Sequence, residues 1–128
     1  MKKIKKILIT GAAGLCGSVL YEGLLKKGYK ITCCDKKKSA SNAAKKINQS
    51  LSKKIKKIDL RNFKDIVKIT KDVDAILHFG GIPRHSPKED LYHKILDHNI
   101  LGTYNLFEAS RISKVKKIIF ASSAHTIG

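Results

Sequence analysis

The chain has 128 residues, of which 42% are hydrophobic and 29% are charged, and its formal net charge is +17. This length suits one domain with a hydrophobic core of its own, and the apolar content excludes a disordered tail. No run of about 18 consecutive apolar residues occurs, so the sequence excludes a membrane-spanning helix.

Short β-branched runs alternate with helical stretches along the chain. The runs predict strands over residues 4–10, 30–35, 55–60, 75–79 and 117–122. The stretches between them predict helices over residues 18–27, 39–50, 63–70 and 86–113. Because apolar strands that alternate with helices form parallel sheets covered on both faces, the pattern predicts a doubly wound α/β fold of the Rossmann type.

Two of the predicted helices have recognisable ends. Gly28 ends the first helix, because glycine readily adopts the left-handed conformation that follows a helix. The expected apolar face of that helix consists of Val19, Leu20, Gly23 and Leu24. In the long fourth helix, Ser86 is the expected cap, Pro87 suits the first position and Glu89 completes a capping box.

A glycine-rich turn, TGAAGLCG at residues 10–17, lies between the first strand and the first helix. Gly11 allows the tight turn, Gly14 lets the backbone approach a pyrophosphate, and Gly17 lets the helix pack closely on the strand. The helix N-terminus offers unpaired N–H groups and a partial positive charge. The expected cofactor contacts here are Gly11, Gly14, Leu15, Cys16 and Gly17. A purely structural turn is the alternative; we expect one NAD(P)-binding domain over residues 1–128.

Asp35 ends the second predicted strand. An acidic side chain at this place accepts hydrogen bonds from the adenosine ribose hydroxyls and repels a 2′-phosphate, which favours NAD over NADP. Lys36, Lys37 and Lys38 follow directly and could attract such a phosphate. A turn residue at the end of a strand is the alternative role for Asp35.

The positive charge comes almost entirely from lysine, because only Arg61, Arg84 and Arg111 among the 27 basic residues are arginines. The lysines are scattered, and no pattern of stacking aromatic residues accompanies them. Base recognition and bidentate phosphate contacts favour arginine. A solvated lysine-rich surface is therefore a better interpretation than specific nucleic-acid binding.

The N-terminus and the cysteines admit a secretory alternative. The basic start and the apolar run after it resemble a signal peptide, but Leu15 is too large for a lipoprotein cleavage box before Cys16. A strand, a turn and a helix account for the same segment. The adjacent Cys33 and Cys34 and the separate Cys16 make neither a disulfide framework nor a metal site, and packing roles are expected for them. A reducing cytoplasm is the simplest location.

The TGxxGxxG motif resembles the short-chain dehydrogenase/reductase superfamily, and further segments resemble its extended branch, the NAD-dependent epimerase/dehydratases. These segments are Asp59-Leu60, His78-Phe79-Gly80-Gly81, Asn99 with Gly102-Thr103-Tyr104-Asn105-Leu106, and Phe120-Ala121-Ser122-Ser123. The resemblance implies that Asp59 and Leu60 contact adenine. It also implies cofactor contacts for Phe79, Gly80, Gly81, Ile82 and Asn99.

Within that branch, HFGG at 78–81 and ASSAHTIG at 121–128 resemble the uronate dehydrogenases. Those enzymes oxidise C1 of a hexuronic acid to an aldarolactone with NAD. The resemblance implies that Ser123 is the catalytic serine and that Ser123, Ala124 and His125 contact the substrate. Ala124 stands where those enzymes usually have Asn, and Pro83 replaces a small polar residue, so the substrate stays open. The alternative for Ser123 is a serine whose hydroxyl hydrogen-bonds a backbone group, and the alternative for His125 is a loop histidine without a substrate.

The family's catalytic base belongs to a Tyr-x-x-x-Lys pair, which removes the hydroxyl proton while hydride leaves for the nicotinamide. The residues four positions after the four tyrosines are Leu25, Cys33, Leu96 and Glu108. We therefore expect an N-terminal part of a longer, homo-oligomeric oxidoreductase, inactive alone. In such a part the fifth strand would form an unpaired edge of the sheet, with free backbone N–H and C=O groups, so the isolated chain is expected to self-associate. The side chains expected to be partly uncovered are Leu91, Ile95, Leu101 or Phe107.

Four functions remain to be compared. The leading one is an NAD-dependent dehydrogenase that acts on a small sugar acid. A nucleotide-sugar epimerase or dehydratase of the same branch is the nearest rival, although such enzymes usually have Val-Tyr-Gly where this chain has Thr126-Ile127-Gly128. A non-catalytic NAD-binding module would keep the glycine turn without the Tyr–Lys pair. A basic nucleic-acid binder would show salt-dependent binding to duplex DNA that NAD does not affect.

Overall fold

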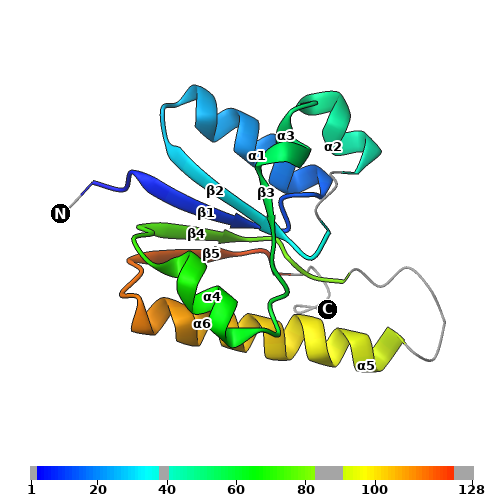
Figure 1. The fold of residues 1–128 in the computed structure, drawn as a ribbon, viewed down its shortest axis with the longest axis vertical. Coiled ribbons are helices and arrows are strands. Elements are labelled where there is room, and N and C mark those ends of the chain that lie inside the picture. Colours follow the sequence, from blue (N-terminus) through cyan, green and yellow to red (C-terminus); the bar gives the residue numbers. More distant parts are fainter. Residues whose placement is uncertain (1–2, 38–40, 83–90, 123–128) are drawn as a thin grey trace.

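A computed structural model describes residues 3–37, 41–82 and 91–122, and Figure 1 shows how its elements are layered. Within these ranges the strands are β1 (Lys6–Thr10), β2 (Lys30–Asp35), β3 (Ile55–Lys57), β4 (Ala75–His78) and β5 (Lys117–Phe120). They pair in parallel, in the order β3-β2-β1-β4-β5. The sheet confirms the predicted doubly wound Rossmann-type fold.

Helices cover both faces of the sheet. One face carries α1 (Leu15–Lys26), α2 (Asn42–Ile47) and α3 (Leu51–Lys54), and the other carries α4 (Phe63–Thr70) and α6 (Gly102–Ile112) (Figure 1). Helix α5 (Leu91–Ile95) and the π-helix η1 (Leu96–Leu101) lead into α6. Ile7 and Ile9 belong to the core under α1, whereas Leu8 between them belongs to the core under α4 and α6. This alternation along the strand buries β1 on both faces.

Strand β1 lies between β2 and β4, and the carboxyl ends of these three strands meet. Thr10, the last residue of β1, pairs with Cys34 of β2 and with His78 of β4. After β2 and β3 on one side of β1, the chain continues to β4 and β5 on the other side. In open α/β sheets, ligands bind outside the carboxyl ends of the strands at such a switch point. The fold therefore positions the candidate site at this edge.

Helix α1 begins earlier than predicted. It starts at Leu15 rather than at Ser18, because Gly14, in extended backbone with φ −82° and ψ 173°, already serves as its N-cap. The predicted end is confirmed, since Gly28 follows the helix with φ +81°. The earlier start extends the helix into the glycine-rich turn, so that the turn and the first helical residues form one unit.

The predicted apolar face of α1 is partly wrong. Val19 is 52% exposed, and the fully buried positions of the helix are Gly17, Ser18 and Tyr21. Small residues at Gly17 and Ser18 let the helix approach its neighbours closely, and the Ser18 hydroxyl donates to the Leu15 carbonyl at 2.7 Å. Leu20 and Leu24 do pack against the core, so the prediction is wrong for Val19 but not for these two leucines.

Two further predicted helices differ from the observed ones. In the stretch predicted as one helix over 39–50, α2 ends at Ile47, and the separate helix α3 begins only at Leu51, beyond the predicted end. Between the two helices, the Asn48 side chain accepts hydrogen bonds from the backbone and hydroxyl of Ser50. The long helix predicted from residue 86 is interrupted by η1, whose wider turns a 3.6-residue pattern does not predict. The expected capping box at 86–89 lies outside the described residues. Strands β1, β3, β4 and β5 are shorter than predicted.

Apolar side chains are exposed around β5, which is an edge strand of the described sheet. Ile119 and Phe120 are about half exposed, and Leu101 and Phe107 are 45% and 42% exposed. The expectation that side chains of the long helix stay partly uncovered is thus confirmed for Leu101 and Phe107. Ile95 is half-buried, and the side chain of Leu91 lies outside the description. Self-association of the chain stays a prediction. Among the described helices, none is long and apolar enough to cross a membrane.

Candidate functional site

The glycine turn after β1 is shaped by backbone atoms that lie too close for a side chain. Gly11 has φ +72°, and a Cβ there would collide with the carbonyl of Phe79 and lie 2.7 Å from the Gly80 nitrogen. A Cβ at Gly17 would collide with the Gly11 carbonyl and lie 2.7 Å from the Ala12 Cα. Gly11 therefore brings the turn against the segment after β4, and Gly17 brings α1 against the turn.

Gly14 has a different environment from the other two glycines of the motif. The nearest atom to a Cβ at this position is the Gly11 carbonyl oxygen, at 3.4 Å, so the space beside Gly14 is open. As N-cap it offers no side-chain acceptor, and the first turn of α1 contains no acidic residue. The first backbone N–H groups of a helix have no intrahelical acceptor, and the helix dipole adds a partial positive charge. This end of α1 is suited to an anion.

A pocket of about 170 Å³ opens at the carboxyl ends of β1, β2 and β4. Nine of the thirteen residues expected to contact the cofactor line it: Gly11, Gly14, Asp35, Asp59, Leu60, Phe79, Gly80, Gly81 and Ile82. Leu15 and Cys16 are exposed on the first turn of α1, and Gly17 is buried against the glycine turn. The motifs from separate parts of the sequence thus converge on one crevice.

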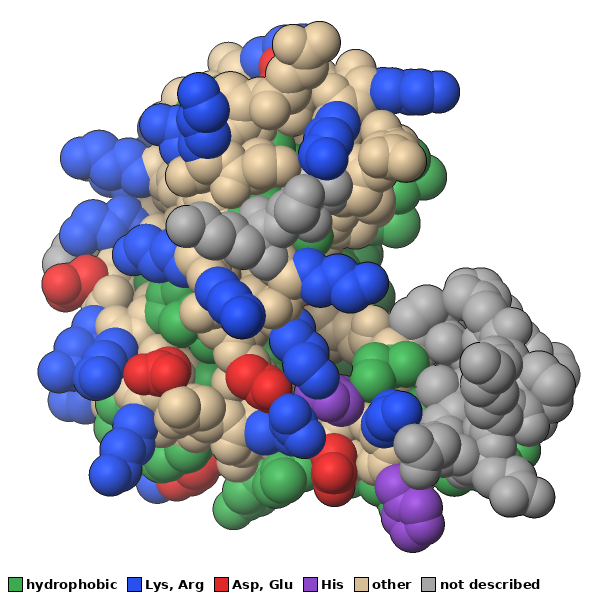
Figure 2. Space-filling view, turned by 45° about the vertical axis from the view of Figure 1, so that its right-hand side comes forward, with side chains coloured by type: hydrophobic (Ala, Val, Ile, Leu, Met, Phe, Trp, Pro, Cys, Tyr) green, Lys and Arg blue, Asp and Glu red, His purple; other side chains and the backbone are tan. Residues whose placement is uncertain are grey.

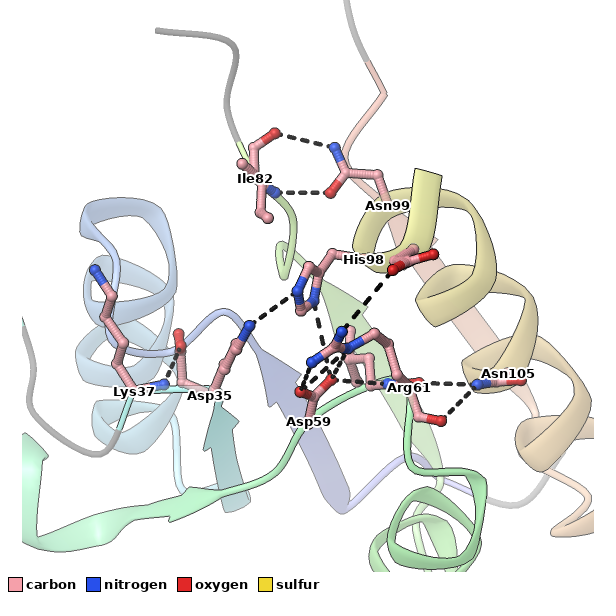
Figure 3. Close-up of polar contacts among 11 residues, drawn as sticks. Asp35, Lys37, Asp59, Arg61, Ile82, His98, Asn99 and Asn105 are labelled. Atoms are coloured by element: carbon pink, nitrogen blue, oxygen red, sulfur yellow. Dashed lines mark hydrogen bonds and ion pairs between the residues drawn. The ribbon is translucent and has the colours of Figure 1, made fainter. Parts of the chain in front are cut away.

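The carboxylate of Asp35 ties the end of β2 to the glycine turn. Its Oδ2 accepts a hydrogen bond from the Ala13 N–H at 3.0 Å. Its Oδ1 accepts one from the Lys37 N–H at 3.0 Å, which Figure 3 shows. The Ala12 N–H also donates to the Cys34 carbonyl at 3.2 Å. Each carboxylate oxygen has a second lone pair for a hydroxyl group. Asp35 is therefore fixed in place at the pocket wall.

Asp59 lies in the pocket wall after β3, and Arg61 donates hydrogen bonds to its carboxylate. The Arg61 Nη2 and Nε donate to Asp59 Oδ2 and Oδ1 at 2.8 Å and 3.1 Å, and the Arg61 backbone N–H donates to Oδ1 at 3.0 Å. These bonds hold the pKa of Asp59 at about 2. Arg61 Nη1 also lies 4.0 Å from Asp97 Oδ2 of η1 (Figure 3). Asp59 is therefore ionised, and its carboxylate is oriented by Arg61.

His98, which the sequence did not indicate as a site residue, lines the same end of the pocket. It projects from η1 toward the Asp59–Arg61 pair, with its Nδ1 3.9 Å from Asp59 Oδ1 (Figure 3). Its Nε2 lies 2.9 Å from the ammonium group of Lys36. Burial lowers the pKa of His98, and the neighbouring Lys36 and Arg61 charges lower it further. The imidazole is therefore held neutral among charged groups.

Asn99 of η1 fixes the backbone of Ile82, which lines the pocket, but its own side chain lies outside the pocket lining. Its Oδ1 accepts from the Ile82 N–H at 2.7 Å, and its Nδ2 donates to the Ile82 carbonyl at 3.0 Å (Figure 3). A Cβ at Gly81 would lie 3.4 Å from Asn99 Oδ1. In α6, Asn105 donates to the Leu60 carbonyl at 3.1 Å. Both asparagines thus fix the backbone of segments that line the pocket.

A buried histidine, His78, supports the glycine pair after β4. The Gly80 N–H donates to the Thr10 hydroxyl oxygen at 3.2 Å, and that hydroxyl lies 2.6 Å from His78 Nδ1. His78 Nε2 lies 3.0 Å from the Thr103 hydroxyl. Both ring nitrogens of His78 are therefore held by threonine hydroxyl groups, which can donate or accept a hydrogen bond. Burial lowers the pKa of His78 to about 4.

The residues expected to contact the substrate, Ser123, Ala124 and His125, lie outside the described residues, as does Pro83. The described part of the chain leads toward them, since the Ala121 N–H after β5 donates to the His78 carbonyl at 3.1 Å. A small pocket beside this segment is lined by Phe120, Ala121, Thr103 and the glycine pair. The catalytic and substrate-contacting roles stay predictions.

Among the described lysines and cysteines, only Lys36 and Cys34 line the pocket that contains Asp35 and Asp59. Figure 2 shows basic side chains spread over one face with acidic ones between them, rather than gathered in a stripe. Burial raises the pKa of the Cys33 and Cys34 thiols to about 12, as expected for packing roles, whereas Cys16 is exposed.

Known proteins resemble this chain in sequence and in structure. It is 36% identical over 123 residues to a uronate dehydrogenase of Pseudomonas syringae pv. tomato, an alignment that covers 96% of the chain and 41% of that enzyme. A uronate dehydrogenase variant of Agrobacterium tumefaciens complexed with NAD matches with a TM-score of 0.76 and 31% identity, over 98% of this chain and 43% of that one.

A solved UDP-glucose 4-epimerase from Bifidobacterium longum, in complex with NAD⁺ and UDP, matches with a TM-score of 0.81 and 28% identity. That match covers 97% of this chain and 38% of the epimerase. The chain thus spans about two fifths of the length of the relatives it matches. The family model described as "NAD dependent epimerase/dehydratase family" matches residues 7–128. With the glycine turn, the pocket and the parallel sheet already in place, this match shows that the chain belongs to the NAD-dependent epimerase/dehydratase family.

Proposed function

We propose that this chain is the NAD-binding part of an oxidoreductase that resembles uronate dehydrogenase. The observation that carries the proposal is the pocket at the carboxyl ends of β1, β2 and β4, where the open N-terminus of α1 meets Asp35 and the glycine pair. Gly14 leaves room beside the first helical amides, and Asp35 presents a carboxylate at the end of β2. The helical amides suit an anion, and the Asp35 carboxylate suits the two hydroxyl groups of a ribose.

Each part of the dinucleotide is assigned to a separate group of pocket residues. The amides of Leu15, Cys16 and Gly17 hold the diphosphate, Asp35 accepts from the adenosine ribose, and Asp59 with Leu60 contacts adenine. The segment from Phe79 to Ile82, fixed by Asn99, lies against the nicotinamide half. When bound, NAD supplies the hydride acceptor. The negative charge of Asp35 favours NAD over the 2′-phosphorylated coenzyme.

We infer for the whole protein the oxidation of C1 of a hexuronic acid to an aldarolactone. The likeness to uronate dehydrogenase supports this reaction, and Ser123, Ala124 and His125 are the residues proposed to contact the sugar acid. Interconversion of a nucleotide sugar is the second candidate, favoured by the higher TM-score with the UDP-glucose 4-epimerase. A homo-oligomer in the cytoplasm is proposed for either enzyme.

Titration of the chain with NAD tests the cofactor assignment. We expect saturable binding to the wild-type chain and a loss of affinity of about tenfold or more in Gly14→Val, because the valine fills the space beside the helical amides. Gly23→Val is the matched control, since a side chain at Gly23 meets no atom within 4 Å. Equal loss in both variants, or no binding to the wild-type chain, contradicts the assignment.

The reaction is tested on the protein encoded by the complete gene. A Tyr-x-x-x-Lys pair encoded beyond Gly128 supports an enzyme, and its absence favours a non-catalytic NAD-binding module. With such a protein, NADH that accumulates with a hexuronic acid supports the dehydrogenase. UDP-galactose formed from UDP-glucose without net NADH supports the epimerase instead.

A further inference from the structure

The end of β2 carries two opposing signals for the coenzyme. Asp35 carries a negative charge that disfavours a 2′-phosphate, whereas the ammonium group of Lys36, the next residue, could attract one. The structure separates the two side chains. Asp35 bonds toward the glycine turn through the Ala13 N–H, and Lys36 reaches the other way, to His98 of η1. The direction of Lys36 therefore depends on a residue far along the chain.

His98 is built to receive this ammonium group. A lysine ammonium only donates, so the 2.9 Å contact requires His98 Nε2 to be unprotonated and to accept. The remaining proton then lies on Nδ1, which faces the Asp59 carboxylate at 3.9 Å. The His98 side chain is only 11% exposed, and Arg61 fixes Asp59 from the other side. The imidazole thus has one tautomer and one orientation.

The π-turn of η1 places His98 where this contact forms. Neighbouring Asn99 is bonded to both backbone groups of Ile82, which fixes the turn at its next residue. Asp97, the residue before, lies 4.0 Å from Arg61. Three successive residues of η1 therefore make three separate contacts, His98 and Asn99 with residues that line the pocket and Asp97 with Arg61 beside it. His98 is held from both sides rather than free to follow Lys36.

We propose that His98 is a specificity-determining residue, which holds the Lys36 ammonium away from the 2′ position of the adenosine ribose and so preserves the preference for NAD. This inference rests on the proposed NAD-binding function. Without the imidazole acceptor, Lys36 is free to turn toward a 2′-phosphate, where a charge-assisted contact with the anion replaces its contact with a neutral ring. The preference thus depends on the Lys36–His98 contact as well as on Asp35.

The test is the ratio of the dissociation constants for NADP and NAD, measured on the chain and its variants at one salt concentration. We expect His98→Ala to lower this ratio by about threefold or more through tighter NADP binding. Adding Lys36→Met to His98→Ala restores the ratio, because the responsible charge is removed. His98→Gln keeps the wild-type ratio, since its amide oxygen can accept from Lys36. Lys45→Met, a charge loss on exposed α2, is the control.

An unchanged ratio in His98→Ala, or an equal shift in the variant that also lacks Lys36, overturns the inference while NAD binding stands. Failure of the wild-type chain to bind NAD overturns the proposed function and this inference together. If His98→Ala does not fold, the same ratio of dissociation constants measured on Lys36→Met alone tests the inference. A ratio that rises about threefold in that variant shows that Lys36 already contacts the 2′-phosphate beside His98, and a ratio near the wild-type value supports the separation.

Discussion

The two ends of the pocket, to which we assign the diphosphate and the adenosine of the proposed cofactor, are lined by different kinds of atoms. At the diphosphate end, the contact surface is backbone, and Gly11 and Gly17 exist because neighbouring main-chain atoms leave no room for a Cβ. At the adenosine end, the charged and polar side chains of Lys36, Asp59 and His98 line the pocket beside the apolar Ile58 and Leu60. The first end is inseparable from the fold, because the atoms that would bind a ligand also connect β1 to α1. The second can change residue by residue without disturbing the sheet.

This difference assigns separate properties to the two ends. Backbone amides at a helix terminus recognise any phosphate group, so the diphosphate end determines the class of ligand. We expect the side chains at the adenosine end to decide which member of the class is preferred. We therefore expect substitutions at the diphosphate end to act on stability and binding together, and those at the adenosine end to act mainly on affinity.

The largest expected effect is that of Gly11→Ala. The new methyl group meets the Phe79 carbonyl at a backbone conformation that L residues rarely adopt, so we expect a loss of about 4 kcal/mol in the free energy of unfolding. Gly28→Ala is the control, since Gly28 also has a positive φ but no atom within 4 Å of the new Cβ. It should cost about 1 kcal/mol. Equal losses by denaturant unfolding would show that backbone contact does not distinguish Gly11.

His78, beneath the glycine pair, gives the next effect, which depends on pH. Its pKa is about 4 in the folded chain, against 6.5 for an ordinary histidine. The unfolded chain therefore binds a proton that the folded chain does not bind between these pH values. Stability is full above pH 6.5 and falls as pH decreases toward 4, by on the order of 3 kcal/mol.

Denaturant unfolding across this pH range measures the effect. His78→Gln, whose amide offers one donor and one acceptor group to the hydroxyls of Thr10 and Thr103, should lose this part of the pH dependence. His93→Gln, at an exposed position of α5, should keep it. The account of His78 fails if the wild-type chain and His78→Gln depend on pH in the same way.

The smallest expected effect is that of Arg61→Gln at the adenosine end. Arg61 holds the pKa of Asp59 at about 2, so this interaction contributes stability above pH 3.8, the ordinary value, and is lost as pH falls toward 2. The variant should raise the pKa of Asp59 toward 3.8, seen by NMR titration of its carboxyl group. NAD binding should weaken by about threefold, because Asp59 loses its orientation.

Arg111→Gln provides a matched loss of charge. Arg111 pairs with Glu108 within α6, at 2.7 Å, away from the pocket. It should change neither the pKa of Asp59 nor the affinity for NAD. Equal weakening of NAD binding by both variants would point to net charge rather than to the orientation of Asp59.

Most of the architecture could be predicted from the sequence, because it depends on local patterns. The order of strands and helices follows from runs of apolar residues, and β2 (Lys30–Asp35) and α4 (Phe63–Thr70) have their predicted bounds. The glycine turn was found from its spacing between a strand and a helix. The start of α1 was missed, because a glycine N-cap lacks the side-chain signal that serine provides.

The parts that could not be predicted depend on contacts between distant segments. A periodic pattern gives no sign of the π-turn of η1, and that turn places His98 beside Lys36 and Asp59. The role of His78 under Gly80 likewise requires Thr10 and Thr103 to be brought together by the fold. A single sequence shows these histidines but does not show what they face.

Amide NMR of the isotope-labelled chain, recorded with and without NAD, tests the central claim most directly. Binding of the coenzyme's diphosphate at the start of α1 predicts large shifts for the Leu15, Cys16 and Gly17 signals and unchanged signals for Lys114 and Lys116 at the opposite end of the sheet. Saturation with NAD that leaves the first turn of α1 unshifted, or that moves only the lysine-rich end, would contradict the claim.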